Sequence, residues 1–85
     1  MTESTKSKMT IFEAREYDDC TKIVDFMKDH TPVVVNFENI EEETAIKVLD
    51  FLSGAAFALH GRLEEVTQNI YVLLPENVEL KRGGK

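Results

Sequence analysis

The hexapeptide PVVVNF, at residues 32–37, is the clearest structural feature of this sequence. Its three consecutive valines, Val33–Val35, are followed by Asn36 and Phe37, so the run is β-branched and almost continuously apolar. Such a run is typical of a strand that is covered on both faces, or nearly so. Pro32 cannot continue a preceding helix. We therefore expect a central strand that begins just after this proline.

An apolar stripe upstream of this strand predicts a helix that ends at about His30 and Thr31. Its members are spaced i, i+3, i+4 and i+7, as on one helical face: Cys20, Ile23, Val24 and Met27. We expect Asp18 to be the N-cap, because its carboxylate can accept the free N–H groups of the first turn. Residues 9–14 are short and mildly apolar and predict an edge strand.

A second, longer helix is predicted downstream, from about Glu41 to about Leu59. Asn39 and Glu42 have the spacing of a capping box. Gly61 follows the last helical residues, as a C-cap glycine does. The stripe that should pack on the sheet consists of Ala45, Val48, Leu49, Leu52, Ala56 and Leu59.

The remaining chain predicts a hairpin of two strands. Residues 63–66 and 70–74 have strand composition, a turn is expected at 67–69, and residues 78–80 are a possible last edge strand. The order is β-α-β-α-β-β, with a final β as an option. Strand–helix–strand units close as right-handed crossovers. We expect an α/β (α+β) fold with two helices packed on one face of a mixed four- to five-stranded sheet.

Length and composition indicate one domain. The chain has 85 residues, 42% hydrophobic and 31% charged. Residues 9–80 form the expected domain, residues 1–8 have the composition of a polar linker or leader, and residues 81–85 that of a polar tail. The net charge of −6 argues against direct binding to nucleic acid or anionic lipid. No apolar run is long enough for a membrane span.

No pattern predicts a catalytic, metal or cofactor site. The single cysteine, Cys20, lies on an apolar stripe and is interpreted as a core residue. His30 and His60 fall at helix ends and have no metal-site spacing with it. The four glycines form no phosphate-binding fingerprint. We therefore expect neither an enzyme nor a cofactor protein.

Surplus apolar surface predicts self-association. A second face of the longer helix is small and apolar, and residues there lie away from the middle of the sheet-packing stripe: Lys47, Phe51, Gly54, Ala55 and Ala58. Gly54 and Ala58 are four apart, so another helix could approach closely. The strand at 70–74 is apolar on both alternation sets, with Tyr71 and Leu73 on one of them. A dimer, or a larger assembly, would bury these surfaces. The alternative is that the first helix, or another chain segment, covers the helical face within one chain.

Three blocks in this order resemble the conserved domain of the SepF cell-division family. They are PVVVNF at 32–37, VLDFLSGA at 48–55 and IYVLLPENV at 70–78, and the match covers about residues 10–80. The resemblance implies a compact dimeric α/β domain that is cytoplasmic, acts at the division septum, and can build rings or filaments. It also implies binding to the C-terminal tail of FtsZ, the tubulin-like division GTPase.

The resemblance further implies a site and a membrane tether. The positions that match the tail-binding motif are Lys47, Phe51, Leu52, Gly54 and Ala55. Self-association is expected to involve Phe51, Gly54, Ala58, Gly61, Tyr71 and Leu73. Family members attach to the inner face of the cell membrane by an amphipathic N-terminal helix, which residues 1–8 are too short and polar to form. We expect membrane contact only through such a helix.

Two other functions stay open on the sequence. One is a purely structural oligomerisation module without a peptide partner. The other is a small regulatory α/β dimer that binds a metabolite, which would need polar, glycine-rich turns at the dimer seam.

Overall fold

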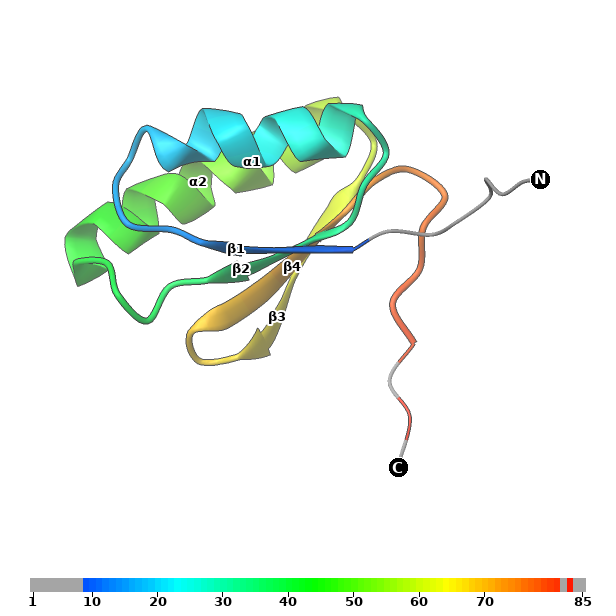
Figure 1. Cartoon of the computed structure of the whole chain (residues 1–85). Coiled ribbons are helices and arrows are strands. Elements are labelled where there is room, and N and C mark those ends of the chain that lie inside the picture. The colour runs from blue at the N-terminus through cyan, green and yellow to red at the C-terminus, as the bar shows by residue number, and fades with distance from the viewer. Residues whose placement is uncertain (1–8, 82, 84–85) are drawn as a thin grey trace.

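The computed structural model describes residues 9–81 and 83, which form two layers (Figure 1). The elements are β1 (Thr10–Glu13), α1 (Asp19–Lys28), β2 (Val33–Asn36), α2 (Glu42–Ala58), β3 (Arg62–Thr67) and β4 (Ile70–Leu74). Both helices lie on the same face of the sheet. The predicted fold class, with two helices on one face of a mixed sheet, is confirmed with four strands.

The central strand is β2, as the PVVVNF stretch predicts. The sheet order is β1-β2-β4-β3, with β1 parallel to β2 and the other two neighbours antiparallel. The parallel pair arises because α1 returns the chain across the sheet between β1 and β2. β3 and β4 form a hairpin whose turn is Gln68 and Asn69, and the register between them shifts near Val66. That turn is one residue shorter than expected.

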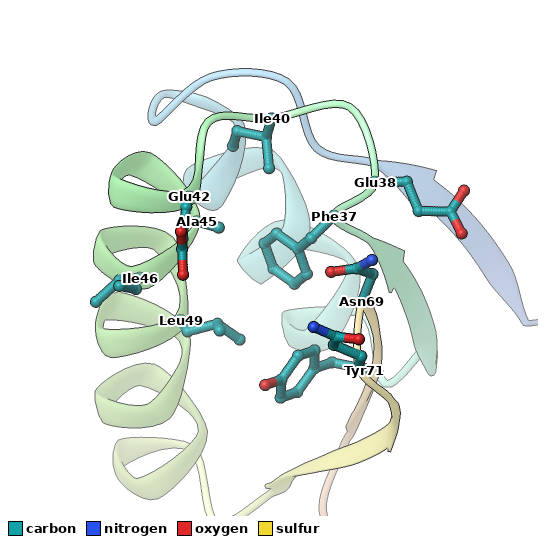
Figure 2. A pocket seen from close by; sticks show the side chains of 10 residues that line it. Phe37, Glu38, Ile40, Glu42, Ala45, Ile46, Leu49, Asn69 and Tyr71 are labelled. Atoms are coloured by element: carbon teal, nitrogen blue, oxygen red, sulfur yellow. The ribbon is translucent and has the colours of Figure 1, made fainter.

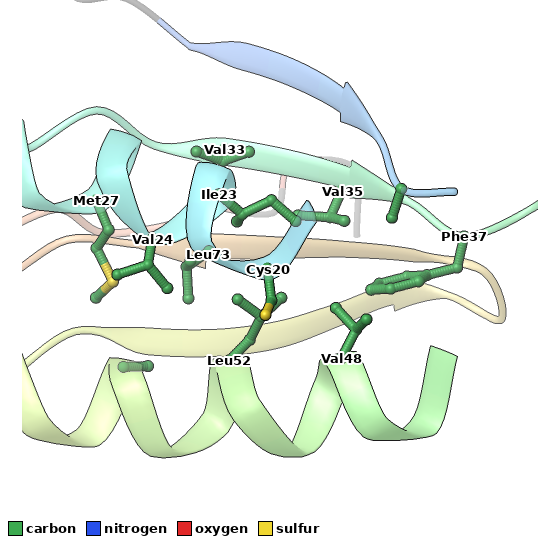
Figure 3. Packing of buried hydrophobic residues seen from close by; sticks show 12 residues of the cluster. Cys20, Ile23, Val24, Met27, Val33, Val35, Phe37, Val48, Leu52 and Leu73 are labelled. Atoms are coloured by element: carbon green, nitrogen blue, oxygen red, sulfur yellow. The ribbon is translucent and has the colours of Figure 1, made fainter. Parts of the chain in front are cut away.

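The core lies between the helices and the sheet (Figure 3). Fully buried side chains come from both helices and from β2 and β4: Ile23, Val33, Val35, Val48, Leu52 and Leu73. Cys20 is also buried, and burial raises the pKa of its thiol. A protonated, enclosed thiol is a weak nucleophile, so the core role predicted for Cys20 is confirmed.

The N-cap predictions are confirmed only in part. Asp18 is the N-cap residue of α1, as predicted, but its carboxylate makes no capping hydrogen bond to the first turn. Instead Asp19, the first helical residue, accepts hydrogen bonds from the preceding backbone N–H groups of Arg15 (2.8 Å) and Glu16 (3.2 Å). At α2 the N-cap position is Glu41, and the capping box does not form because Asn39 donates its amide to Glu13 on β1.

The two helices end in the same way. His30 and His60 take left-handed backbone conformations, with φ of 60° and 64°. The next residues donate back into the helices, Thr31 to the Phe26 carbonyl and Gly61 to the Ala56 carbonyl, at 2.9 and 2.8 Å. This is the Schellman arrangement. The sequence predicted Gly61 as the C-cap glycine, but the left-handed residue is His60, one position earlier.

The optional last strand at residues 78–80 does not form; residues 75–81 contain no strand. β4 ends before Pro75, and the chain then turns, with the Val78 N–H donating to the Pro75 carbonyl at 3.2 Å. Asn77 is left-handed in this turn, with φ of 70°. A left-handed residue interrupts an extended chain, so the segment leaves the direction of the sheet.

Candidate functional site

The candidate site is the side of α2 that faces away from the sheet. We call it the outer face of α2 and define it by Ile46, Lys47, Phe51, Gly54, Phe57 and Ala58, all of which are exposed. Three of the seven exposed large hydrophobic side chains of the described chain belong to it: Ile46 (53% exposed), Phe51 (39%) and Phe57 (86%). Apolar side chains gathered in this way are typical of an interaction surface.

The opposite side of α2 explains why this face is left over. Val48, Leu52 and Ala56 are buried against the sheet and α1, and the partly buried residues beside them complete the stripe: Ala45, Leu49 and Leu59. That confirms the predicted packing stripe. A helix with apolar residues on this side and on its outer face as well has more apolar surface than the described chain covers.

Phe51 contacts an aromatic ring from outside α2. Its ring makes an edge-to-face contact with Tyr17, with centroids 6.4 Å apart and planes at 84°. Tyr17 lies just before α1 and is itself exposed. Ala55 is partly buried and packs against the core cluster. Neither Phe51 nor Ala55 is therefore fully buried within one chain.

Gly54 opens the surface next to Phe51. A Cβ built on it would have no described atom within 4 Å. The glycine is therefore not required by packing inside the chain. A shallow, side-chain-free position beside an aromatic ring lets another backbone approach closely.

The other residues predicted for the site lie elsewhere. Leu52 and Leu73 are fully buried, and Tyr71 lies on the helix side of β4, where its ring meets Phe37 at 5.6 Å. Gly61 lies at the junction of α2 and β3. The structure thus brings together Lys47, Phe51, Gly54 and Ala58 on one surface, and it does not bring these four others to that surface. Sequence reasoning placed Ile46 and Phe57 on a different side of α2, and the structure shows that both are exposed.

The sheet offers less free apolar surface than expected. Val72 and Leu74 point away from the core cluster, yet each is only 1% exposed in the single chain. Ile11, on the edge strand β1, is 75% exposed. Free apolar surface on the strands is therefore found at the edge and not along the middle of the sheet.

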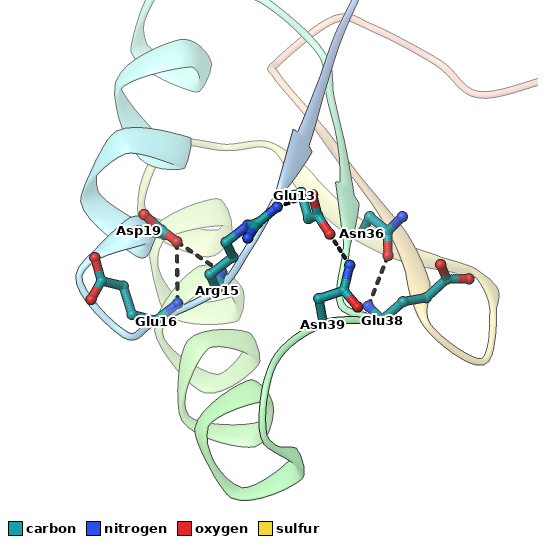
Figure 4. A network of polar contacts seen from close by, with 7 residues as sticks. All are labelled: Glu13, Arg15, Glu16, Asp19, Asn36, Glu38 and Asn39. Atoms are coloured by element: carbon teal, nitrogen blue, oxygen red, sulfur yellow. Dashed lines mark hydrogen bonds and ion pairs between the residues drawn. The ribbon is translucent and has the colours of Figure 1, made fainter.

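Polar contacts near the ends of β1 and β2 are structural (Figure 4). Arg15 forms an ion pair with Glu13 at 2.9 Å, and Glu13 also accepts from Asn39. The bond from Asn39, followed by that from Arg15, lowers the pKa of Glu13. These bonds join the loop after β1 to the loop after β2. Among the described residues, no group of three or more His, Cys, Asp or Glu side chains could hold a metal ion.

A second surface feature is a groove of about 420 Å³ between the start of α2 and the β3–β4 turn (Figure 2). Phe37 and Tyr71 line it from the sheet, and Ala45, Ile46 and Leu49 line it from α2. Sequence reasoning missed it, because its walls come from segments more than twenty residues apart. None of the described helices is long and apolar enough to cross a membrane.

Comparison with known proteins gives one consistent result. The family model described as "Cell division protein SepF" matches residues 9–80. The cell division protein SepF of Alkaliphilus metalliredigens is 42% identical over 77 residues, which are 91% of this chain and 52% of that protein. The SepF of Listeria innocua is 39% identical over 74 residues, 87% of this chain and 49% of that protein. The chain thus spans about half the length of the curated relatives it matches.

Solved structures show the same fold. The SepF-like protein from Archaeoglobus fulgidus superposes with a TM-score of 0.82 over 92% of this chain and 96% of that one, at 18% identity. The SepF-like protein from Pyrococcus furiosus also gives 0.82, over 94% and 100%, at 15% identity. The backbone fold is therefore similar although few residues are identical.

Proposed function

The chain belongs to the SepF family of cell-division proteins, and on that premise we propose that it is a non-catalytic adaptor that binds the C-terminal tail of FtsZ and associates with itself. The observation that carries the proposal is the outer face of α2. It combines an anchoring ring (Phe51), an open glycine (Gly54) and a cation (Lys47) within two turns of one helix.

The chemistry of this face fits a short peptide. Aliphatic side chains of the tail would pack on Phe51 and over Gly54, as in the recognition of a peptide on an apolar helix face. Lys47 would pair with a carboxylate of the tail. A disordered tail loses conformational entropy when it binds, so each contact is expected to be weak.

Self-association would turn weak contacts into firm attachment. A dimer offers two sites to a polymer that carries many tails, and linked binding of this kind raises the effective affinity by about 10²–10⁴. Phe57, which is 86% exposed, provides apolar surface that the tail need not cover. We assign it to contact with a second copy of the chain.

Attachment to the membrane completes the proposed role. We assign it to an amphipathic N-terminal helix of the kind implied by the family resemblance. The site of action would then be the division septum, on the cytoplasmic side of the membrane. In this account the described domain itself contributes the FtsZ contact and the assembly contact.

Co-sedimentation with FtsZ polymers tests the proposal. Polymers of intact FtsZ should carry the chain into the pellet, and polymers that lack the C-terminal tail should leave it in the supernatant. Equal pelleting with both would show that the tail is not the partner. No pelleting with either, from a chain that still self-associates in light scattering, would favour a purely structural oligomerisation module.

A further inference from the structure

The groove between α2 and the β3–β4 turn has a chemistry different from that of the outer face of α2. We propose that it is a second docking site, for a peptide segment of a partner protein in which an aliphatic or aromatic side chain is flanked by Lys or Arg. This goes beyond the proposed function, because it needs neither Phe51 nor the FtsZ tail.

The floor of the groove is aromatic and already rigid. Phe37 and Tyr71 meet edge to face, with planes at 88°, and Phe37 is 5% exposed. The Phe37 N–H is bonded to the Asn69 carbonyl at 2.8 Å, which joins the end of β2 to the hairpin turn. A floor fixed in this way loses little entropy when a ligand binds.

The walls are apolar and come from α2 and the loop before it. Ile40, Ala45 and Leu49 are half-buried and face the aromatic pair across the groove, as Figure 2 shows. Ile46 lies at the margin and is exposed. A volume of about 420 Å³ is ample for one large side chain and part of the backbone on either side.

The rim determines the charge of the occupant. Glu42 and Glu38 line it, with the Glu38 carboxylate pointing away from α2 in Figure 2, and among the described residues no Lys or Arg lines it. The net charge of the whole chain, −6, also favours a positively charged partner. The start of α2 favours negative charge at this end of the helix, which Glu42 and Glu43 supply. Glu38 lies outside the helix, so its charge is not offset by the helix dipole.

The remaining rim residues suit a peptide and not a simple cation. Gln68 and Asn69 place side-chain amides at the edge of the groove. An amide carries both a donor and an acceptor, which is the pair that a peptide backbone requires. An apolar floor, an acidic rim and amide edges together fit an apolar anchor with basic neighbours.

Fluorescence anisotropy with two labelled peptides tests the proposal on the full chain. The probes are Lys-Lys-Leu-Phe-Lys-Lys and Glu-Glu-Leu-Phe-Glu-Glu, which share their apolar centre. The basic peptide should bind saturably, and the backbone amide NMR signals of Ala45, Leu49 and Asn69 should shift. The acidic peptide should bind at least about tenfold more weakly, the ratio expected when two charge pairs are replaced by like-charge contacts.

Variants separate this groove from general attraction to an acidic protein. Glu38→Gln and Glu42→Gln should each weaken the basic peptide by about 1.5- to 5-fold, the range for exposed charge pairs. Glu16→Gln and Glu79→Gln remove the same charge away from the groove and should leave its affinity unchanged. Ile46→Ser should weaken binding without unfolding, because Ile46 is half exposed.

Three binding results, and one NMR result, would overturn the proposal. One is equal binding of the two peptides, the second is equal loss from all four glutamate variants, and the third is the absence of saturable binding. Amide shifts confined to the residues around Phe51 would also overturn it, because the outer face of α2 would then be the site. The FtsZ co-sedimentation result bears on none of these, so the two proposals can fail independently.

Discussion

Gly61 packs directly against the backbone carbonyl of Leu74, at the point where the chain leaves α2 and enters β3. A Cβ at residue 61 would collide with that oxygen and with the terminal methyl group of Met27 on α1. Arg62, the next residue, pairs with Leu74 in the sheet. One glycine thus lets α1, the end of α2 and the β3–β4 hairpin meet closely.

We predict that Gly61→Ala destabilises the fold by about 1–3 kcal/mol, as overpacking does when backbone must move. The free energy of unfolding in urea measures the change. Gly54→Ala is the matched control, since that site is open and helical, and it should gain about 0.5–1 kcal/mol. A Gly61→Ala variant as stable as Gly54→Ala would contradict the packing described here.

We expect the Asp19 carboxylate to make a contribution to stability that depends on pH. Burial alone raises the pKa of this carboxyl group, but the N–H groups of Arg15 and Glu16, with Lys22, bring the pKa below its ordinary value. A depressed folded-state pKa gives stability that is present above the unfolded value of about 3.9 and is lost as the pH falls through the folded value.

We therefore expect Asp19→Ala to cost about 1–3 kcal/mol at pH 7, where two N–H groups lose a charged acceptor. The difference in the free energy of unfolding between Asp19→Ala and the wild type should become smaller as the pH is lowered below about 4. Asp25→Ala, at an exposed position of α1, serves as the control with little effect. A gap for Asp19→Ala that is the same at pH 7 and pH 2.5 would argue against the charged bond.

At the left-handed histidines we expect a substitution that stabilises the fold. A left-handed conformation costs an L-residue with a Cβ about 1–2 kcal/mol, and glycine avoids this cost. His60→Gly should raise the free energy of unfolding by up to about 1 kcal/mol, after the greater entropy of the unfolded glycine chain is subtracted. His60→Val should lower it, since β-branched residues tolerate this region least. Thermal unfolding that ranks valine with glycine would refute the assignment of the helix end.

Substitution of Phe57 tests which surface would join two copies of the chain in the proposed assembly. At 86% exposure its replacement should change stability by no more than about 0.5 kcal/mol. Phe57→Ser should nevertheless lower the mean mass measured by light scattering at high protein concentration. Ile11→Ser, at the exposed edge strand, is the comparison. If Ile11→Ser dissociates the assembly and Phe57→Ser does not, the self-association surface lies on the sheet.

Much of the fold could be predicted from periodicity. The valine run at 33–35 identified the central strand, and the stripe from Val48 to Ala56 identified the buried side of α2. The N-cap position of α1 was predicted, but the capping hydrogen bonds were not, because they depend on local geometry that several polar residues can supply. Asp18 and Asp19 are equivalent on sequence, and only the course of the chain after β1 brings Arg15 N–H to the second of them.

The candidate site was predictable in part. Spacing on α2 placed Phe51, Gly54 and Ala58 together, and the exposure of all three agrees with that. Leu73 was grouped with them because an apolar strand does not reveal which of its faces the helices cover. The groove depends on contacts between β2, α2 and the hairpin turn, and no local pattern reports such contacts. Its acidic rim could be recognised only once Glu38 and Glu42 were seen on one opening.

Calorimetric titration of a synthetic FtsZ tail peptide into the wild type and into Phe51→Ala is the most direct test of the adaptor role. The account predicts saturable binding to the wild type and binding at least about tenfold weaker to the variant, a loss of about 1.4 kcal/mol. Circular dichroism should show that the variant keeps its fold, because Phe51 is partly exposed and touches only Tyr17 among ring partners of the described chain. Equal binding by the two proteins would remove the site from the outer face of α2, and no heat from a folded wild type would contradict the adaptor role itself.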